Sequence, residues 1–172
     1  KCGGAVAVAA AAFGTATIPR CLKIVGPGSP WLVAAKRQLA DRIDTGLPAG
    51  PSESIVFADA GTDARLAAMD LLIEAEHGDD SSAYLVTAER ALAEAVRAEL
   101  PALLAAMGAE RRGYAEAVLT GPRGGIVLAP SMDEAVGFVN DYAPEHLQLV
   151  GEDPHRFLDD IVNAAEILIG HH

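Results

Sequence analysis

The chain has 172 residues, of which 51% are apolar and 22% are charged, and this suits one compact α/β body or parts of two. Its net charge of −11 argues against nucleic acid or an anionic membrane surface as a partner, because both attract Lys and Arg. No apolar run reaches the ~18 residues of a membrane span. The most apolar stretch, Ala5 to Phe13, is too short and lacks a basic leader, so we expect no membrane partner and no signal peptide.

The two cysteines, Cys2 and Cys21, have neither a C-x-x-C spacing nor a nearby histidine. A disulfide between them stays open as an alternative. Their pattern favours buried free thiols in a reducing compartment, and we therefore expect a cytoplasmic protein. The chain starts at Lys1 rather than Met, and we expect it to be a segment of a longer protein.

Residues 1–50 predict two helices and one strand. Gly3 and Gly4 precede a run of alanines, which indicates a helix that ends near Gly14. Residues 21–26 (CLKIVG) predict a short buried strand, and residues 31–43 predict an amphipathic helix. The Pro- and Gly-rich residues 44–53 are a connector and the best candidate for a domain boundary.

Beyond the connector, strands and helices alternate regularly. Apolar runs of four to six residues between helices indicate a parallel sheet covered on both faces, and we predict a Rossmann-like α/β fold. Thr62 or Asp63 is the expected cap of the first of these helices. In such sheets ligands bind off the carboxyl ends of the strands, where we expect the site. The predicted strands cover residues 54–60, 82–87, 124–130, 147–151 and 166–170, and the predicted helices cover residues 62–77, 88–107, 113–121, 131–142 and 153–165.

The sequence EAEH ends one predicted helix and contains a candidate metal site. Glu74 and His77 are three residues apart and therefore lie on one helical face, whereas Glu76 points elsewhere. A carboxylate and an imidazole on one face can share a divalent ion. The alternative is a solvated helix end, in which His77 is favoured by the negative end of the helix dipole.

Residues 143–149 (APEHLQL) contain a candidate acid–base pair. Pro144 suits the first position of a short helix, and Glu145 suits the positive end of its dipole. The adjacent Glu145 and His146 supply two proton-transfer groups, one of which belongs to the residue type that titrates near neutral pH. The alternative is a capped surface turn.

Two turns are further candidates. GPGS, residues 26–29, follows the predicted strand 21–26 and opens a helix, where free backbone N–H groups favour an anion or phosphate. It lacks the G-x-G-x-x-G spacing, and a tight turn is the simpler interpretation. GPSE, residues 50–53, places Ser52 at a strand start, where its hydroxyl either faces a cleft or closes the turn.

Six motifs occur together along the chain: GGAxAxAAxAFGTxTIP, KIVGPG, AAKRQ, AGPSExxVxAD, DLLxxAEHG and APEHLxL. In this order and spacing they resemble the histidinol dehydrogenase family over the whole chain. Members of that family oxidise L-histidinol through the aldehyde to L-histidine, with two NAD molecules and one zinc per site, as homodimers with shared sites. The resemblance implies two Rossmann-like domains, with residues 1–51 part of the second domain and residues 52–172 the main domain.

The same resemblance assigns roles to individual residues. It implies that His77 binds zinc, together with Glu74 at the position of a family Gln. Glu145 resembles the general base that activates water for the aldehyde-to-acid step, and His146 resembles the base that takes the alcohol proton. Ser52 matches a serine that contacts the substrate, and Glu74, His77 and His146 complete the implied substrate-binding set.

Three departures from the family pattern lead to two alternatives to the family's reaction for this chain. Val6 and Ser29 stand where a family Gln and Asn contact NAD, and both lose polar contacts with that cofactor. Glu74 replaces Gln and adds negative charge beside the zinc. The family's other two zinc ligands, an Asp and a His, lie beyond Gly170, and the two C-terminal histidines do not match their motif. The alternatives are a dehydrogenase of the same family for another small polar alcohol, or a truncated chain that keeps only the fold.

Overall fold

The computed structural model describes residues 1–46 and 50–171. The chain divides into two compact units, Lys1–Gly50 and Pro51–His172. No helix in the described part is long and apolar enough to cross a membrane. Both cysteines are free thiols, but Cys2 is exposed and Cys21 is only partly buried, so the expectation of buried thiols is wrong.

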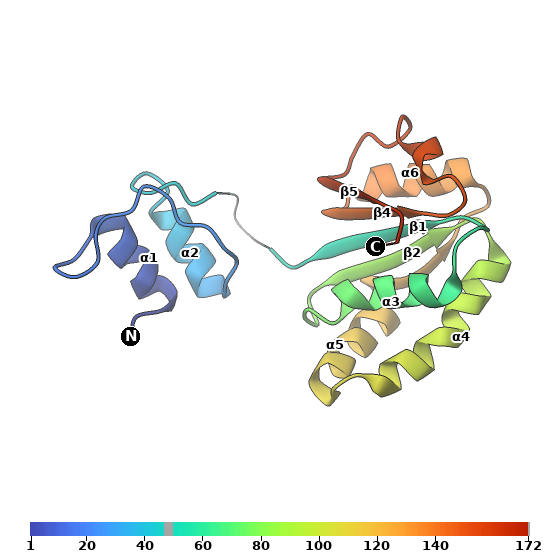
Figure 1. The fold of residues 1–172 in the computed structure, drawn as a ribbon, viewed down its shortest axis with the longest axis horizontal. Coiled ribbons are helices and arrows are strands. Elements are labelled where there is room, and N and C mark those ends of the chain that lie inside the picture. The colour runs from blue at the N-terminus through green and yellow to red at the C-terminus, as the bar shows by residue number, and fades with distance from the viewer. Residues whose placement is uncertain (47–49, 172) are drawn as a thin grey trace. The chain divides into compact units, whose positions relative to one another are not determined.

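The first unit contains the helices α1 (Gly4–Phe13) and α2 (Pro30–Gln38), which contact each other (Figure 1). Gly14 ends α1 as predicted, because its φ of 77° is in the left-handed region that glycine adopts without a steric cost. The helix α2 is shorter than the predicted range 31–43. Membership of this unit in a second Rossmann-like domain stays a prediction.

The predicted strand over residues 21–26 is wrong. Lys23 forms a single isolated parallel bridge with Asp44, and Leu22 and Val25 are 85% and 80% exposed. A strand needs a partner along its length, and the described residues supply one bridge only. The turn of residues 26–29 therefore does not follow a strand, although it does precede α2.

The second unit is built on a five-stranded sheet in the spatial order β3-β2-β1-β4-β5, with all neighbouring strands parallel. This confirms the predicted α/β fold with a parallel sheet. The connector ends where β1 begins, directly after Ser52. The strands are β1 (Glu53–Ala58), β2 (Ser82–Thr87), β3 (Gly124–Leu128), β4 (His146–Val150) and β5 (Glu166–Ile169).

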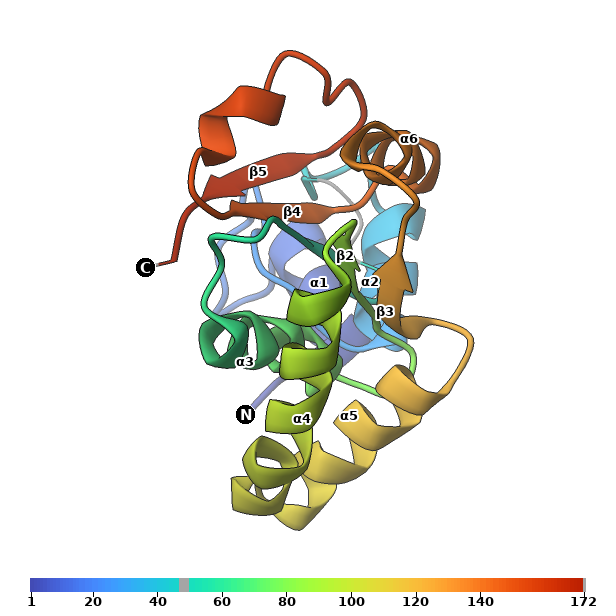
Figure 2. The same cartoon turned by 90° about the vertical axis from the view of Figure 1, so that its right-hand side faces the viewer.

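Helices cover both faces of this sheet (Figures 1 and 2). One face carries α3, α4 and α5, and the other carries α6 and a short 3-10 helix, η1. Asp63 caps α3, since its carboxylate accepts hydrogen bonds from the backbone N–H groups of Arg65 and Leu66. The bounds are α3 (Ala64–Ala75), α4 (Arg90–Ala106), α5 (Ala109–Thr120), α6 (Met132–Tyr142) and η1 (Pro154–Phe157).

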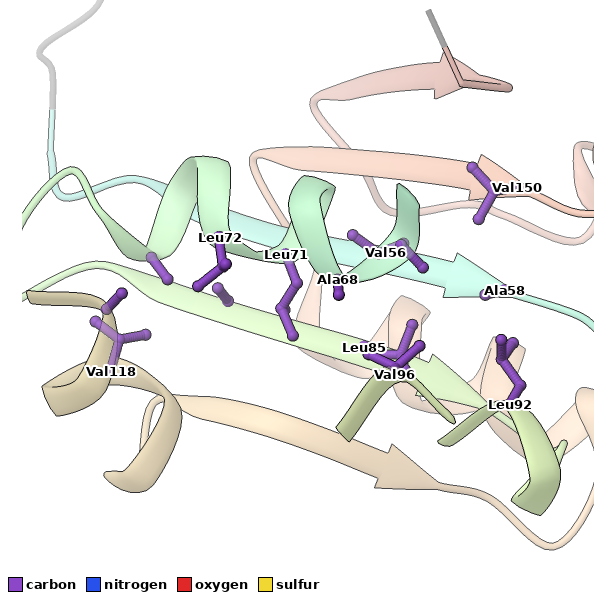
Figure 3. Close-up of a cluster of buried hydrophobic side chains, with 14 residues drawn as sticks. Val56, Ala58, Ala68, Leu71, Leu72, Leu85, Leu92, Val96, Val118 and Val150 are labelled. Carbon is purple, nitrogen blue, oxygen red and sulfur yellow. The ribbon is translucent and has the colours of Figure 1, made fainter. Parts of the chain in front are cut away.

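Alternating residues of the strands build two cores, one on each face. Val56 and Leu85 point toward Leu71 of α3 and Val96 of α4 (Figure 3). Residues one position away, such as Ile55, pack against α6 instead. Because successive side chains of a strand point to opposite faces, the strand sequences must be apolar almost throughout, which is the pattern that predicted a covered parallel sheet.

The helix predicted over residues 153–165 is wrong beyond its first turn. Only Pro154–Phe157 is helical, as η1. Asn140 of α6 accepts a hydrogen bond from the Val162 N–H at 2.8 Å and donates one to the Asp160 carbonyl at 2.8 Å. This side chain satisfies backbone groups that a helix would have paired internally, so the segment runs on as an irregular loop to β5.

Candidate functional site

Most of the candidate residues lie at the edge of the sheet where its strands begin. Ser52 directly precedes β1, and His146 is the first residue of β4. Since Glu53 lies opposite Ser82 of β2 in the ladder, α3 must return to this edge before β2 starts. Its last turn therefore brings Glu74 to the same edge. The expectation of a site at the carboxyl ends of the strands is wrong for these residues.

Because successive side chains of a strand point to opposite faces, the polar side chains at this edge of the sheet point to the face that α3 covers. Leu147 belongs to the core under α6, so its neighbours His146 and Gln148 point to the opposite face. Ser54 lies opposite His146 in the ladder and points to that face too, as does Val56. Ser54, His146, Gln148 and Glu74 line one cavity of about 80 Å³ between α3 and the strands.

His77 has the hydrogen bonding of a metal-binding histidine. Its Nδ1 lies 2.7 Å from the Ile73 carbonyl oxygen, and because a carbonyl only accepts, Nδ1 must carry the hydrogen. The Nε2 lone pair is then left for a metal, in the arrangement by which backbone carbonyls fix the tautomer of ligating histidines. The ring is about half exposed, with a side-chain exposure of 51%.

Glu74 is placed beside His77 but is more buried. Its Oε2 lies 3.8 Å from His77 Nδ1, and its side chain is 19% exposed. The predicted pair is therefore adjacent, and its donors fit zinc, which binds both imidazole nitrogen and carboxylate oxygen. Within residues 1–46 and 50–171 no group of three or more His, Cys, Asp and Glu is arranged to hold a metal, so the pair would form part of a larger ligand set.

Glu145 and His146 lie outside any helix, and the predicted helix at Pro144 is wrong. The helix α6 ends at Tyr142, and Ala143 takes a left-handed conformation with φ of 55°. Residues 144 and 145 then lead directly into β4. Glu145 Oε1 lies 3.8 Å from His146 Nε2, which is close enough for a charge interaction but too long for a hydrogen bond.

Glu166 is a neighbour of this pair that the sequence did not single out. It lies opposite His146 in the β4–β5 ladder, and its Oε2 is 2.7 Å from His146 Nδ1. No local pattern marks it, because the contact depends on the register of two strands that are 20 residues apart. His146 therefore lies between two carboxylates rather than beside one.

Three further polar residues were also missed. Asp70 Oδ2 accepts hydrogen bonds from Gln148 Nε2 at 2.9 Å and from His171 Nδ1 at 2.8 Å. Ser54 Oγ is buried and has no hydrogen-bond partner. Two of these had a signal in the sequence: Asp70 is one helical turn before Glu74, and Gln148 is two strand positions after His146.

The two predicted cofactor residues lie in the first unit. Val6 is 69% exposed on α1. Ser29 is the N-cap residue of α2, and its side chain makes no capping hydrogen bond. Ser29 therefore has a hydroxyl available at a helix N-terminus, whereas Val6 offers no polar group. A cofactor role for either residue stays a prediction.

A parallel sheet with an acid–base pair, a carboxylate and a histidine at one edge defines a Rossmann-like α/β protein with a candidate site for proton transfer. Comparison with known proteins narrows this class. The family described as histidinol dehydrogenase matches residues 1–172. The chain belongs to the histidinol dehydrogenase family, which is a family of oxidoreductases.

Individual relatives agree with this assignment. The chain is 60% identical over 172 residues to a protein of Mesorhizobium japonicum named "Histidinol dehydrogenase homolog 2" and 50% identical to the histidinol dehydrogenase of Synechocystis sp.. It resembles the crystal structure of histidinol dehydrogenase from Elizabethkingia anophelis with a TM-score of 0.90 and 34% identity, over 99% of this chain. The chain spans 39% of the length of each of these three proteins.

Proposed function

We propose that the full-length protein oxidises L-histidinol through the aldehyde to L-histidine, with NAD and zinc, as a step of histidine biosynthesis. Membership in the histidinol dehydrogenase family supports this reaction class. The observation that carries the proposal is that Glu74 and His146 line the same cavity. A candidate metal ligand and a candidate proton acceptor therefore face one small space.

The residues of this chain have distinct tasks in the proposal. His146 takes the proton of the alcohol through Nε2, and Glu145 activates water for attack on the aldehyde. Ser52 and the ligand pair Glu74 and His77 hold the substrate at the strand edge. When bound, zinc would polarise the substrate oxygen and NAD would accept the hydride.

A specific observation favours a second candidate function, the oxidation of another small polar alcohol. Glu74 puts a carboxylate into the cavity where the family pattern has a neutral Gln. Charge of this kind alters which polar groups bind, because an unmatched buried charge is costly. The word "homolog" in the names of several relatives agrees with a divergence of substrate.

A substrate comparison separates the candidates. The purified full-length protein, supplied with zinc, is assayed for NADH formation with L-histidinol and with a panel of other small polar alcohols. The first candidate predicts the highest kcat/KM with L-histidinol, and the second predicts it with another alcohol. Absence of NADH and NADPH formation with every alcohol would leave the non-catalytic alternative and would overturn both proposals.

The proposal also includes the oligomeric state, the location and the domain arrangement of the protein. We propose a homodimer with shared sites, a cytoplasmic location, and a domain arrangement in which residues 1–51 belong to a second Rossmann-like domain and residues 52–172 to the main one. The boundary between the two compact units at Gly50 and Pro51 supports the last of these. Sedimentation of the full-length protein tests the dimer.

A further inference from the structure

The contact between His146 and Glu166 is fixed by the backbone of two strands. His146 pairs with Glu166 in the parallel β4–β5 ladder, and the Glu166 N–H donates to the Glu145 carbonyl at 2.9 Å. The side chains of His146 and Glu166 point to the same face of the sheet. The next residue of each strand, Leu147 or Ile167, packs under α6 on the opposite face. The ladder thus brings the carboxylate to His146 Nδ1 at 2.7 Å.

This contact decides which nitrogen of His146 can accept a proton. An ionised carboxylate only accepts hydrogen bonds, so Nδ1 carries the hydrogen and donates it to Glu166. The Nε2 of a neutral ring is then a bare acceptor. Its distance of 3.8 Å from Glu145 Oε1 is too long for a hydrogen bond, so Nε2 remains available to a substrate hydroxyl.

We infer that Glu166 is a positioning residue for His146 in the alcohol-oxidation step, an inference that rests on the proposed function. Glu166 holds the ring in the Nδ1–H tautomer, and its negative charge stabilises the imidazolium that forms when Nε2 takes the alcohol proton. In this step the O–H bond of the alcohol breaks and the N–H bond at Nε2 forms, and NAD, when bound, would accept the hydride from the same carbon. Glu166 itself neither takes up nor releases a proton in this step.

A purely structural role does not explain the pair. The Glu166 side chain is 54% exposed and that of His146 is 32% exposed, and ion pairs with such exposure stabilise folded proteins little. The β4–β5 register is held by backbone hydrogen bonds and by Ile167 in the core. Substitution of Glu166 is therefore expected to leave the fold and the melting temperature unchanged.

Three variants of the full-length protein separate charge from orientation. Glu166→Gln keeps an acceptor oxygen but removes the charge, and Glu166→Ala removes both. Glu94→Gln is the matched control, because Glu94 is exposed on α4. We expect kcat for the alcohol to fall about 10–100-fold in Glu166→Ala, by analogy with hydrogen-bond partners that orient metal-binding histidines. Glu166→Gln should fall less, and Glu94→Gln not at all.

Three readouts identify a positioning role. KM for the alcohol should change little, because Glu166 is placed against His146 rather than the substrate. Oxidation of added aldehyde, which depends on Glu145, should keep most of its rate. The ¹⁵N resonances of the His146 ring should report the Nδ1–H tautomer alone in the parent protein and in Glu166→Gln, and a mixture of tautomers in Glu166→Ala.

The outcomes distinguish this inference from the proposed function. Unchanged ring resonances in Glu166→Ala overturn the inference, whatever the activity. Wild-type alcohol turnover in Glu166→Ala overturns it as well. If the parent protein oxidises no alcohol, the proposed function fails, and the catalytic part of the inference fails with it, while the tautomer measurement still decides whether Glu166 orients His146.

Discussion

Gln148 on β4 donates a hydrogen bond of 2.9 Å to the Asp70 carboxylate on α3, and the same amide nitrogen lies 3.0 Å from the Gly170 carbonyl oxygen. His171 Nδ1 binds the same Asp70 oxygen at 2.8 Å. Asp70 therefore connects α3, β4 and the segment that follows β5. It lies one helical turn before Glu74, so this connection holds the end of α3 over the candidate site.

Removal of the Asp70 carboxylate should loosen that end of α3. Asp70→Ala leaves the Gln148 amide and the His171 ring each without this acceptor, and we expect a cost of about 1–2 kcal/mol, near the lower end for hydrogen bonds to charged groups. Amide hydrogen exchange of α3 in the full-length protein measures the loss. Asp159→Ala is the control, because Asp159 is exposed in the loop after η1. Equal exchange in both variants would show that Asp70 does not hold α3.

Tyr84 should make stability fall at alkaline pH. Burial, and secondarily the nearby Tyr142, raises the pKa of the Tyr84 phenol above its ordinary value of 10.0, while Arg123 opposes this shift. Because the folded-state pKa is raised, the contribution to stability is fully present below pH 10.0 and is lost as the pH rises through the folded pKa. The phenol also donates a hydrogen bond to the Pro122 carbonyl at 2.8 Å.

The measurement is the unfolding midpoint of the parent protein and of Tyr84→Phe as the pH rises from neutral. At neutral pH the unfolding midpoint of Tyr84→Phe should differ from that of the parent protein by a constant amount, because the variant lacks the hydrogen bond of the phenol. The difference between the two proteins should shrink above pH 10.0, since only the parent has the phenol to ionise. A difference that stays constant across this range contradicts the assigned direction of the pKa shift.

His77 should be required for metal binding. Full-length protein is expected to contain about one zinc per chain, because a catalytic zinc takes about three protein ligands and this chain offers the adjacent Glu74 and His77 as two of them. His77→Ala should lose the metal, as measured by elemental analysis. His155→Ala, which changes an exposed histidine in η1, should keep it. Retention of zinc in His77→Ala would make EAEH a solvated helix end.

His146 should be required for the first oxidation step. His146→Asn removes the proton acceptor, and alcohol oxidation is expected to slow about 10²–10⁴-fold, the usual contribution of a general base. Oxidation of added aldehyde should be less affected. Steady-state rates with the alcohol and with the aldehyde make the comparison. An unchanged rate with the alcohol would assign the proton transfer to another group.

Local chemistry predicted much of this fold. Asp63 has a carboxylate that accepts backbone N–H groups two and three residues ahead, so its capping role depends on nothing distant. The strand sequences are apolar because both faces are covered. By contrast, the predicted helix over residues 153–165 does not form beyond its first turn because the side chain of Asn140 binds backbone groups 20 or more residues away. No local sequence pattern shows that this side chain competes with helical hydrogen bonds.

The candidate site could be predicted where its residues are neighbours in sequence, and not where they meet through strand pairing. Glu74 and His77 are neighbours by helical spacing, and Glu145 and His146 by adjacency. Glu166 reaches His146 only through the β4–β5 register, which the sequence does not define. The position of the site at the starts of the strands follows from the direction of α3, and the general rule about carboxyl ends does not hold for this set.

The most direct test of the account is the number of NADH molecules formed for each alcohol molecule consumed, with parallel identification of the product, in the parent full-length protein and in Glu145→Gln. If Glu145 and His146 serve two successive oxidations, the parent protein should form two NADH and the acid from its alcohol substrate. Glu145→Gln should form about one NADH and release the aldehyde, because water is no longer activated. Two NADH at the parent rate in Glu145→Gln, or an aldehyde as the final product of the parent protein, would contradict the account.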